Sequence, residues 1–304
     1  MENIIKIEHL NKSYGDVKAV QDISFNVRKG ELFAFLGVNG AGKSTTISMI
    51  CGQLKKDSGN ITVCGKNVEN DFEEISRNIG VVFQNSVLDA QLSAKDNLRS
   101  RAALYGITGK AFEKRFEELS QLLDFGDFAN RAINKLSGGQ KRKIDIARAL
   151  IHEPEIIILD EPTTGLDPQT RKTLWNVVDK LRKEKGLTVF LTTHYMEEAA
   201  DANYIIIIDS GKIVAEGSPL ELKNKYVSDY VTIYGGNKND AEKFGFPYEE
   251  IRDGIRLSIP NTEKITQLIV ENPSAFVDYE VVKGKMDDVF LAVTGKDLTG
   301  GAEK

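Results

Sequence analysis

The stretch Gly37-Val38-Asn39-Gly40-Ala41-Gly42-Lys43-Ser44-Thr45 decides how the rest of this sequence is interpreted. It follows an apolar run, Leu32 to Leu36, that is typical of a buried strand, and the residues after it can continue as a helix. In such a strand, loop and helix, inward-turned backbone N–H groups form a cradle for phosphate. Lys43 is expected to reach the β- and γ-phosphates of a nucleotide, and the Ser44 hydroxyl to bind Mg²⁺. The predicted phosphate-site residues are Gly37, Asn39, Gly40, Ala41, Gly42, Lys43, Ser44 and Thr45.

The composition is that of a soluble globular protein with one large core or two moderate ones, because 41% of its 304 residues are hydrophobic. No run approaches the ~18 to 20 consecutive apolar residues of a membrane span, and the first residues do not resemble a secretory signal. A formal charge of -5 argues against general nucleic-acid binding, so the cluster Lys141-Arg142-Lys143 is interpreted as solvated helix surface. Cys51 and Cys64 lack a zinc-type spacing and fit a reducing cytoplasm. Any membrane role is expected to depend on a partner chain.

Strands alternate with helices over the first 225 residues, which predicts an α/β core with its ligand beyond the carboxyl ends of the strands. Two half-buried antiparallel strands are expected at Ile4 to Leu10 and Val20 to Val27, with Tyr14 on their connection. The pattern becomes helical from Ala94 to about Ala132, and a further helix is predicted over Lys141 to Ile151. We interpret this part as a helical insertion.

Two acidic residues follow the buried run Ile156 to Leu159. The first, Asp160, is placed to hold Mg²⁺ directly or through water, with Ser44 and Gln84 as further oxygen donors. The second, Glu161, is placed to orient or deprotonate the water that attacks the γ-phosphate. The sequence therefore assigns different chemistry to two neighbouring carboxylates.

The three histidines receive different interpretations. His194 ends a second buried strand, so we expect it to contact the γ-phosphate and to hold Glu161 in place. His9 and His152 are interpreted as structural residues, which is the commoner role of an isolated histidine.

Taken together, these residues resemble the nucleotide-binding subunit of an ATP-binding cassette (ABC) transporter. The matching motifs, in the family's order, are the aromatic loop at Tyr14, the Walker A loop Gly37 to Thr45, the Q-loop at Gln84, the signature Leu136-Ser137-Gly138-Gly139-Gln140, the Walker B strand ending in Asp160-Glu161, the D-loop Gly165-Leu166-Asp167 and the switch histidine His194. The resemblance covers about residues 3 to 225 and implies an ATPase that uses ATP and Mg²⁺, with Glu161 and His194 as catalytic residues. It further implies that ATP is bound by Tyr14, Gln84, Ser137, Gly138, Gly139, Gln140 and Asp167 as well as by the phosphate loop.

In this family two cassettes pair head to tail, so that each ATP lies between the Walker A loop of one chain and the signature of the other. The resemblance implies such a dimer, for which a homodimer is expected and a heterodimer stays open. It also implies a separate integral-membrane permease and a peripheral position on the cytoplasmic face of the cell membrane. No nucleic-acid partner is expected.

Three segments are similar to the drug-exporter branch of the family, the daunorubicin-resistance ATPases: the turn Thr163 to Pro168, the stretch Val87 to Leu98 after the Q-loop, and the C-terminal stretch Met286 to Gly295. Export is therefore expected, although import stays open. The transported substrate cannot be read from a cassette that does not contact it. The alternative is a soluble ABC ATPase that acts on ribosomes or nucleic acid, but the sequence has none of that class's usual features: a second cassette, a long coiled-coil insertion or zinc cysteines.

The predicted fold is an α/β P-loop ABC-type nucleotide-binding domain with an antiparallel β subdomain and a helical subdomain, followed by a small α+β appendage. The composition changes after about Lys225, so the nucleotide-binding domain is predicted over residues 1–225, with its helical subdomain at about 94–150. Residues 226–304 are predicted to form an accessory or regulatory domain. Its predicted strands are 231–234, 255–259 and 276–282, and its predicted helices are 262–271 and 286–293.

Overall fold

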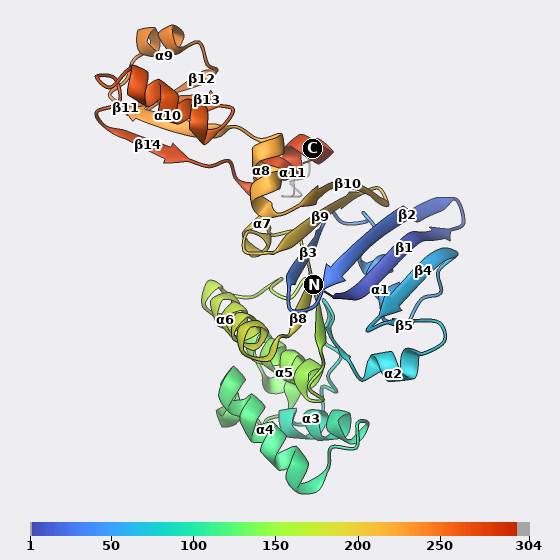
Figure 1. Cartoon of the computed structure of the whole chain (residues 1–304). Helices are drawn as coiled ribbons and strands as arrows, with labels where there is room; N and C mark the ends of the chain where they lie inside the picture. The colour runs from blue at the N-terminus through green and yellow to red at the C-terminus, as the bar shows by residue number, and fades with distance from the viewer. Residues whose placement is uncertain (1, 297–304) are drawn as a thin grey trace. The chain divides into compact units, whose positions relative to one another are not determined.

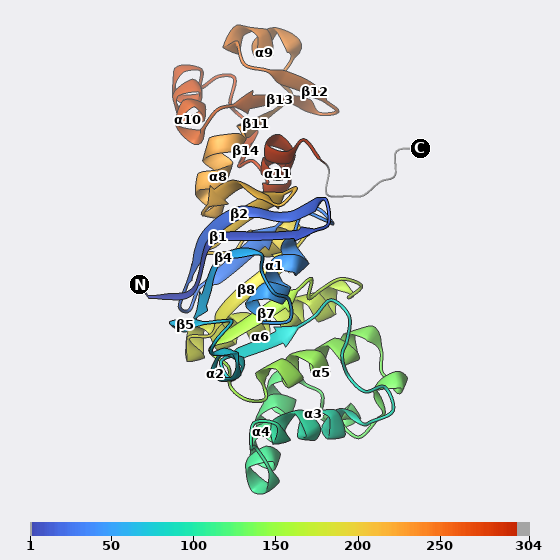
Figure 2. The ribbon, with the colours of Figure 1, turned by 90° about the vertical axis from the view of Figure 1, so that its right-hand side faces the viewer.

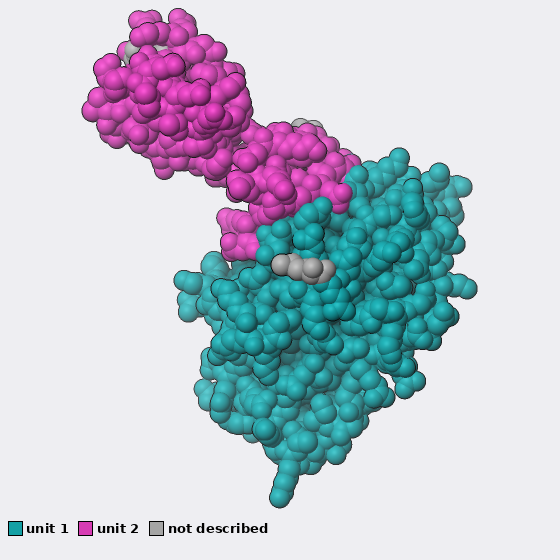
Figure 3. Space-filling view, viewed as in Figure 1, with its two compact units in different colours: residues 1–194, 202–213 teal, residues 195–201, 214–304 magenta. Residues whose placement is uncertain are grey.

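The computed structural model describes residues 2–296, and the chain divides into two compact units. Unit 1 consists of Met1–His194 and Ala202–Ile213, and unit 2 consists of Tyr195–Asp201 and Val214–Lys304 (Figure 3). The predicted boundary at Lys225 falls inside unit 2, within a helix that was not predicted. Residues 297–304 of the predicted accessory domain lie outside the described residues. The division of functions between 1–225 and 226–304 stays a prediction.

A six-stranded sheet, built largely from unit 1, carries the loops of the expected nucleotide site (Figure 1). Its strands are β3 (Leu32–Leu36), β6 (Ile79–Val82), β7 (Ile156–Asp160), β8 (Thr188–Thr193), β9 (Tyr204–Asp209) and β10 (Lys212–Gly217). The order is β10-β9-β3-β8-β7-β6, and the pairs from β9 to β6 are parallel. Strands β3 and β7 are buried throughout, as expected of parallel strands covered on both faces. The carboxyl ends of β3, β6, β7 and β8 therefore meet at one edge.

A four-stranded antiparallel sheet packs beside this core, as predicted. Its strands are β1 (Asn3–Tyr14), β2 (Val17–Arg28), β4 (Ser58–Val63) and β5 (Lys66–Asn67), in the order β2-β1-β4-β5. Both N-terminal strands are longer than predicted, because their pairing continues past several irregularities in register as far as Tyr14 and Val17. The rings of Phe25 and Phe33, one from each sheet, stack with centroids 5.4 Å apart, which ties the sheets together through one core.

Helices cover the six-stranded sheet and form the predicted helical insertion. They are α1 (Lys43–Ile50), α2 (Phe72–Ser76), α3 (Ala94–Ala103), α4 (Gly109–Leu123), α5 (Gly138–Leu150) and α6 (Pro168–Lys185), with 3₁₀ turns at Gly126–Phe128 and Ile133–Lys135. Helices α3, α4 and α5 lie together at the end of unit 1 away from the antiparallel sheet (Figures 1 and 2). Helix α5 begins three residues before the predicted Lys141, because the signature glycines are themselves helical and Ser137 caps them.

Unit 2 contains the predicted α+β appendage. Its elements are α7 (Met196–Ala199), α8 (Pro219–Tyr226), β11 (Asp229–Tyr234), α9 (Lys238–Phe244), β12 (Tyr248–Ile251), β13 (Gly254–Ile259), α10 (Thr262–Glu271), β14 (Tyr279–Val282) and α11 (Met286–Thr294). The antiparallel sheet has the order β12-β13-β11-β14, and one face packs against α10 through a small apolar core. The short elements α8, α9 and β12 were missed. The strand predicted to start at Phe276 starts at Tyr279, since Phe276 is a core residue of the preceding turn.

Within residues 2–296, no helix has the length and apolarity that a membrane span requires.

Candidate nucleotide site

The phosphate loop joins β3 to α1 and depends on its glycines for steric reasons. Gly42 has φ 110°, and a Cβ there would lie 2.4 Å from the carbonyl oxygen of Ala19. A Cβ at Gly37 would lie 2.5 Å from the carbonyl oxygen of Ile208. The loop can therefore follow this path only without side chains at these two positions. Its tip is exposed at Asn39 and Gly40, whereas Ala41 is buried.

Lys43 is the first residue of α1, and its side chain turns back over the loop. The side chain is 5% exposed, and Nζ donates to the carbonyl oxygens of Gly37 at 2.7 Å and of Val38 at 3.2 Å. Burial lowers the pKa of Lys43, while the nearby carboxylates of Glu161 and Asp160 act in the opposite direction. The loop thus holds a buried cation beside two acids, at a helix N-terminus.

Asp160 and Ser44 form the part of the site that fits Mg²⁺. Ser44 Oγ lies 3.5 Å from Asp160 Oδ2, although the residues are far apart in the sequence. The other carboxylate oxygen, Oδ1, accepts a hydrogen bond from Thr192 Oγ1 at 2.5 Å. Thr192 is fully buried on the neighbouring strand β8, so it fixes the carboxylate with Oδ2 toward the serine. A hydroxyl and a carboxylate oxygen presented side by side are the hard donors that Mg²⁺ prefers. Sequence reasoning missed Thr192.

Glu161 stands at the centre of the expected catalytic group. Gln84 donates from Nε2 to Glu161 Oε2 at 2.9 Å, and Thr164 Oγ1 donates to the same oxygen at 3.4 Å. His194 Nδ1 lies 3.5 Å from the other oxygen, Oε1. The structure therefore joins Gln84 to Glu161 by a hydrogen bond. The expected role of Gln84 in binding Mg²⁺ stays a prediction.

The backbone of Glu161 is in the left-handed region, with φ 46°. Residues other than glycine rarely adopt this conformation, because their Cβ then lies too close to the backbone. Such a backbone persists where the surrounding structure holds it on several sides. Here the backbone N–H of Glu161 donates to the carbonyl oxygen of Thr192 at 3.0 Å, which holds it from one side.

Arg142 holds the same turn from the other side, and this corrects the sequence interpretation. The cluster Lys141-Arg142-Lys143 was expected to be solvated, but Arg142 is 7% exposed. Its guanidinium donates to four backbone carbonyl oxygens: Pro162 at 2.6 Å, Phe83 at 2.6 Å, Glu161 at 2.9 Å and Asp160 at 3.4 Å. The prediction was wrong because the fold buries Arg142 while the two lysines beside it stay only partly buried, a difference that a run of charges does not reveal.

The signature residues build the start of α5. Ser137 Oγ accepts from the backbone N–H of Gln140 at 3.2 Å, and Gln140 Oε1 accepts from the backbone N–H of Ser137 at 3.0 Å. This capping box explains the start of the helix. A Cβ at Gly139 would lie 3.0 Å from the Thr170 side chain, whereas one at Gly138 would meet no described atom within 4 Å. Gly138 therefore leaves open space at the helix start.

Two further expected residues lie at the ends of elements. Asp167 caps α6 by accepting from the backbone N–H of Thr170 at 2.9 Å and from its hydroxyl at 2.6 Å. These hydrogen bonds lower the pKa of Asp167. Tyr14 ends β1 with half of its side chain exposed, and Lys12 Nζ lies 5.7 Å from its ring centroid. Their contacts with ATP stay predictions.

The structure therefore brings together two groups of the expected residues and leaves a third group apart. The loop contacts Asp160 through Ser44, and Glu161 gathers Gln84 and His194. In the part of the chain that the structure describes, no hydrogen bond or ion pair joins the signature residues 137–140 to the phosphate loop.

Comparisons with known proteins show the family to which the chain is similar. A family model described as ABC transporter matches residues 20–164. The Nod factor export ATP-binding protein I of Cupriavidus pinatubonensis is 34% identical over 299 residues, which cover 97% of this chain and 92% of that protein. The chain belongs to the ABC transporter family. Within this ABC family it is an ATP-binding subunit and an ATPase, as predicted.

Two further relatives extend the comparison. The linearmycin resistance ATP-binding protein LnrL of Bacillus subtilis is 36% identical over 310 residues, covering 97% of this chain and 99% of that protein. A solved ABC cassette, a dimer in a post-hydrolysis state bound to ADP and Pi, superposes with a TM-score of 0.66 at 30% identity. The superposition covers 71% of this chain and 98% of that cassette. The predicted cassette fold is confirmed.

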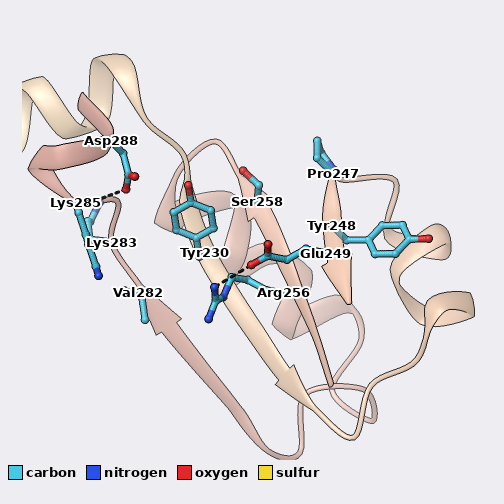
Figure 4. A pocket seen from close by; sticks show the side chains of 10 residues that line it. All are labelled: Tyr230, Pro247, Tyr248, Glu249, Arg256, Ser258, Val282, Lys283, Lys285 and Asp288. Carbon is cyan, nitrogen blue, oxygen red and sulfur yellow. Dashed lines mark hydrogen bonds and ion pairs between the residues drawn. The ribbon is translucent and has the colours of Figure 1, made fainter. Parts of the chain in front are cut away.

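A separate cavity of about 660 Å³ lies in unit 2, on the sheet face opposite α10 (Figure 4). Its floor includes Tyr230, and charged side chains stand on either side. Arg256 pairs with Glu249 at 2.8 Å, and Lys283 pairs with Asp229 at 3.2 Å. Since most of these charges are matched, the lining favours no ligand of one sign, and we assign the cavity no part in the ATP chemistry.

Proposed function

We propose that this chain is the ATP-hydrolysing subunit of an exporter and that it drives a separate integral-membrane permease. The names of its relatives support export, since one is a Nod factor export protein and another a linearmycin resistance protein. Both relatives align over almost the whole chain, including the part after the cassette. The alternative of a soluble ATPase on ribosomes or nucleic acid has no such support.

In the proposed mechanism the loop and Lys43 bind the phosphates. The N–H groups at the start of α1 face the anion, and the buried ammonium of Lys43 moves from its carbonyl partners to the β- and γ-phosphates. Ser44 and Asp160, with Gln84 as a further donor, would hold Mg²⁺, which when bound would neutralise charge that develops on the transferred phosphoryl group. Thr192 keeps Asp160 in the required orientation.

The surroundings of Glu161 are the single observation that carries the hydrolytic role. Its side chain is 8% exposed, and the carboxylate has a donor or an imidazole at each oxygen. We propose that Glu161 orients and deprotonates the attacking water, and that His194 contacts the γ-phosphate and keeps the carboxylate aimed at that water. Gln84 follows β6 and stands beside this carboxylate, so it is placed to report whether the site is filled.

We propose that two chains form a homodimer in which ATP lies between the loop of one chain and the signature of the other. The solved cassette is a dimer, which supports the pairing of two chains, and the open space beside Gly138 at a helix N-terminus supports binding of a phosphate there. Ser137, Gly138, Gly139 and Gln140 would then bind the γ-phosphate of the partner's ATP, with Asp167 close to the interface. The exposed ring of Tyr14 would stack on the adenine.

The proposed location is the cytoplasmic face of the cell membrane, where the dimer is held by its permease. We further propose that residues 1–225 carry the ATP chemistry and that residues 226–304 assist assembly or regulation. All residues of the proposed ATP site lie in unit 1, which supports this division.

Affinity purification tests the proposed function. The tagged chain, recovered from detergent-solubilised cells that express it with its chromosomal neighbours, should bring down an integral membrane protein with about six spans. A Glu161→Gln chain should be recovered with the same partner but without ATP turnover. Recovery with ribosomes or nucleic acid and without a membrane protein would contradict the exporter role.

A further inference from the structure

One buried side chain, that of Arg142, donates hydrogen bonds to four backbone carbonyl oxygens. Arg142 lies on α5, two residues after the signature, and its guanidinium reaches the ends of two strands of the central sheet. Nη1 donates to Phe83, the residue before Gln84, and Nε and Nη2 donate to the turn after β7. A planar guanidinium with five N–H groups suits such a fork, whereas an ammonium on a flexible stem does not.

The hydrogen bonds of Arg142 reach Glu161 and both of its neighbours in the sequence. They end on the carbonyl oxygens of Asp160, Glu161 and Pro162, so the peptide groups on both sides of Glu161 are fixed. Glu161 has the left-handed backbone that a glutamate rarely adopts. If these bonds were lost, the turn could relax toward a commoner backbone conformation and carry the carboxylate away from its observed place.

The same guanidinium also fixes the residue that leads into Gln84. Since Gln84 donates to Glu161 Oε2, one side chain sets both partners of that hydrogen bond. We propose that Arg142 is a positioning residue that links the signature helix to the hydrolytic carboxylate of its own chain. The proposal rests on the proposed hydrolytic role of Glu161. A displacement of α5 is thereby transmitted to Glu161 and Gln84 together.

Arg148 offers a matched control on the same helix. It donates from Nη2 to the carbonyl oxygen of Val81 at 2.6 Å, so it also joins α5 to β6. Unlike Arg142, it makes no hydrogen bond, within the described residues, to the turn that carries Glu161. A change from arginine to lysine at either position keeps the charge and removes the fork, and only Arg142→Lys should release the turn.

The experiment compares the full-length wild type with Arg142→Lys, Arg148→Lys and Glu161→Gln. Arg142→Lys should lower kcat about 10- to 100-fold, since a misplaced group can cost that much, while KM for ATP stays within about threefold. Arg148→Lys should keep kcat near the wild-type value even if its Tm falls equally. In a Glu161→Gln background, Arg142→Lys should cause no further loss, because it acts through that residue.

The outcomes separate the proposal from the proposed function. Wild-type turnover in Glu161→Gln would remove the hydrolytic role of Glu161 itself. An inactive Glu161→Gln beside an Arg142→Lys chain of wild-type kcat would overturn the positioning role alone. Equal losses in the two arginine variants, or a rise in KM that accounts for the loss, would show a purely structural role. If Arg142→Lys does not fold, Arg142→Gln is measured in its place. If neither Arg142 variant folds while Arg148→Lys does, the proposal is also overturned.

Discussion

Gln84 donates a hydrogen bond from Nε2 to Glu161 Oε2 at 2.9 Å, across 77 positions of the sequence. The two residues meet because β6 and β7 are neighbouring parallel strands, so the segments that follow them leave the sheet at the same edge. Thr192 and His194 arrive at that edge from β8, which pairs with β7 on its other side. The proposed catalytic group is thus brought together by strand order.

Glu161→Gln should bind ATP with Mg²⁺ and accumulate as a closed dimer. Loss of a general base typically lowers the rate about 10²- to 10⁴-fold, and the glutamine keeps the size of the side chain. Asp160→Asn should instead weaken the Mg²⁺-dependent part of ATP binding, because this carboxylate faces Ser44. Titration of ATP with and without Mg²⁺ checks both variants, and equal affinities would count against the division of roles.

Thr192→Val should weaken Mg²⁺-dependent ATP binding roughly 10-fold, since partners that orient a metal ligand commonly contribute this much to affinity. The variant keeps the shape of the side chain but removes the donor to Asp160 Oδ1. Thr188→Val is the control on the same strand: its hydroxyl is equally buried but accepts from the backbone N–H of Gly30. A comparable loss of Mg²⁺ dependence in both variants would show a general effect on β8.

Mixed dimers test the site shared between two chains. Lys43→Ala removes the phosphate clamp, and Ser137→Arg blocks the start of α5, so each homodimer has two damaged sites and should be nearly inactive. A mixed dimer collects both lesions in one site and leaves the other intact. Mixing should restore trapping of one nucleotide per dimer. Turnover is measured beside trapping, because a requirement for two occupied sites would suppress turnover alone. If mixed dimers form but neither nucleotide trapping nor turnover is restored, the proposal of a site shared between two chains is wrong.

His152 should make the protein less stable in mild acid. Its ring stacks on Tyr105 at 4.0 Å, Nε2 contacts the carbonyl oxygen of Ile79, and burial lowers the pKa of His152 from 6.5 to about 4. The unfolded chain therefore binds the proton more readily, so the free energy of unfolding falls as the pH drops from about 6.5 to 4. By pH 5 the loss due to this residue is about 2 kcal/mol.

His152→Phe checks this dependence, because phenylalanine can stack on Tyr105 but does not titrate. Urea unfolding at pH 7 and pH 5 should show that the difference in stability between wild type and variant shifts by about 2 kcal/mol in favour of the variant. Parallel pH profiles would mean that His152 does not carry the acid sensitivity.

The sequence by itself determined the elements whose signals are local. Helix α6 runs from Pro168 to Lys185, because Asp167 and Pro168 start it and Gly186, with φ 67°, ends it. The phosphate loop could also be predicted from the sequence, since the path of one short segment requires its glycines and Lys43. Motif order then identified the family, and the comparisons confirm it.

Only the tertiary structure decided which distant groups meet and which charged residue is buried. Lys141, Arg142 and Lys143 look alike in the sequence, yet Arg142 alone faces the carbonyl oxygens at the ends of β6 and β7. Thr192 belongs to none of the sequence motifs. Its role follows only from the pairing of β8 with β7, which brings its hydroxyl to Asp160. The physical reason is that burial and hydrogen bonding are properties of neighbours in space, and strand order supplies neighbours that residue spacing does not encode.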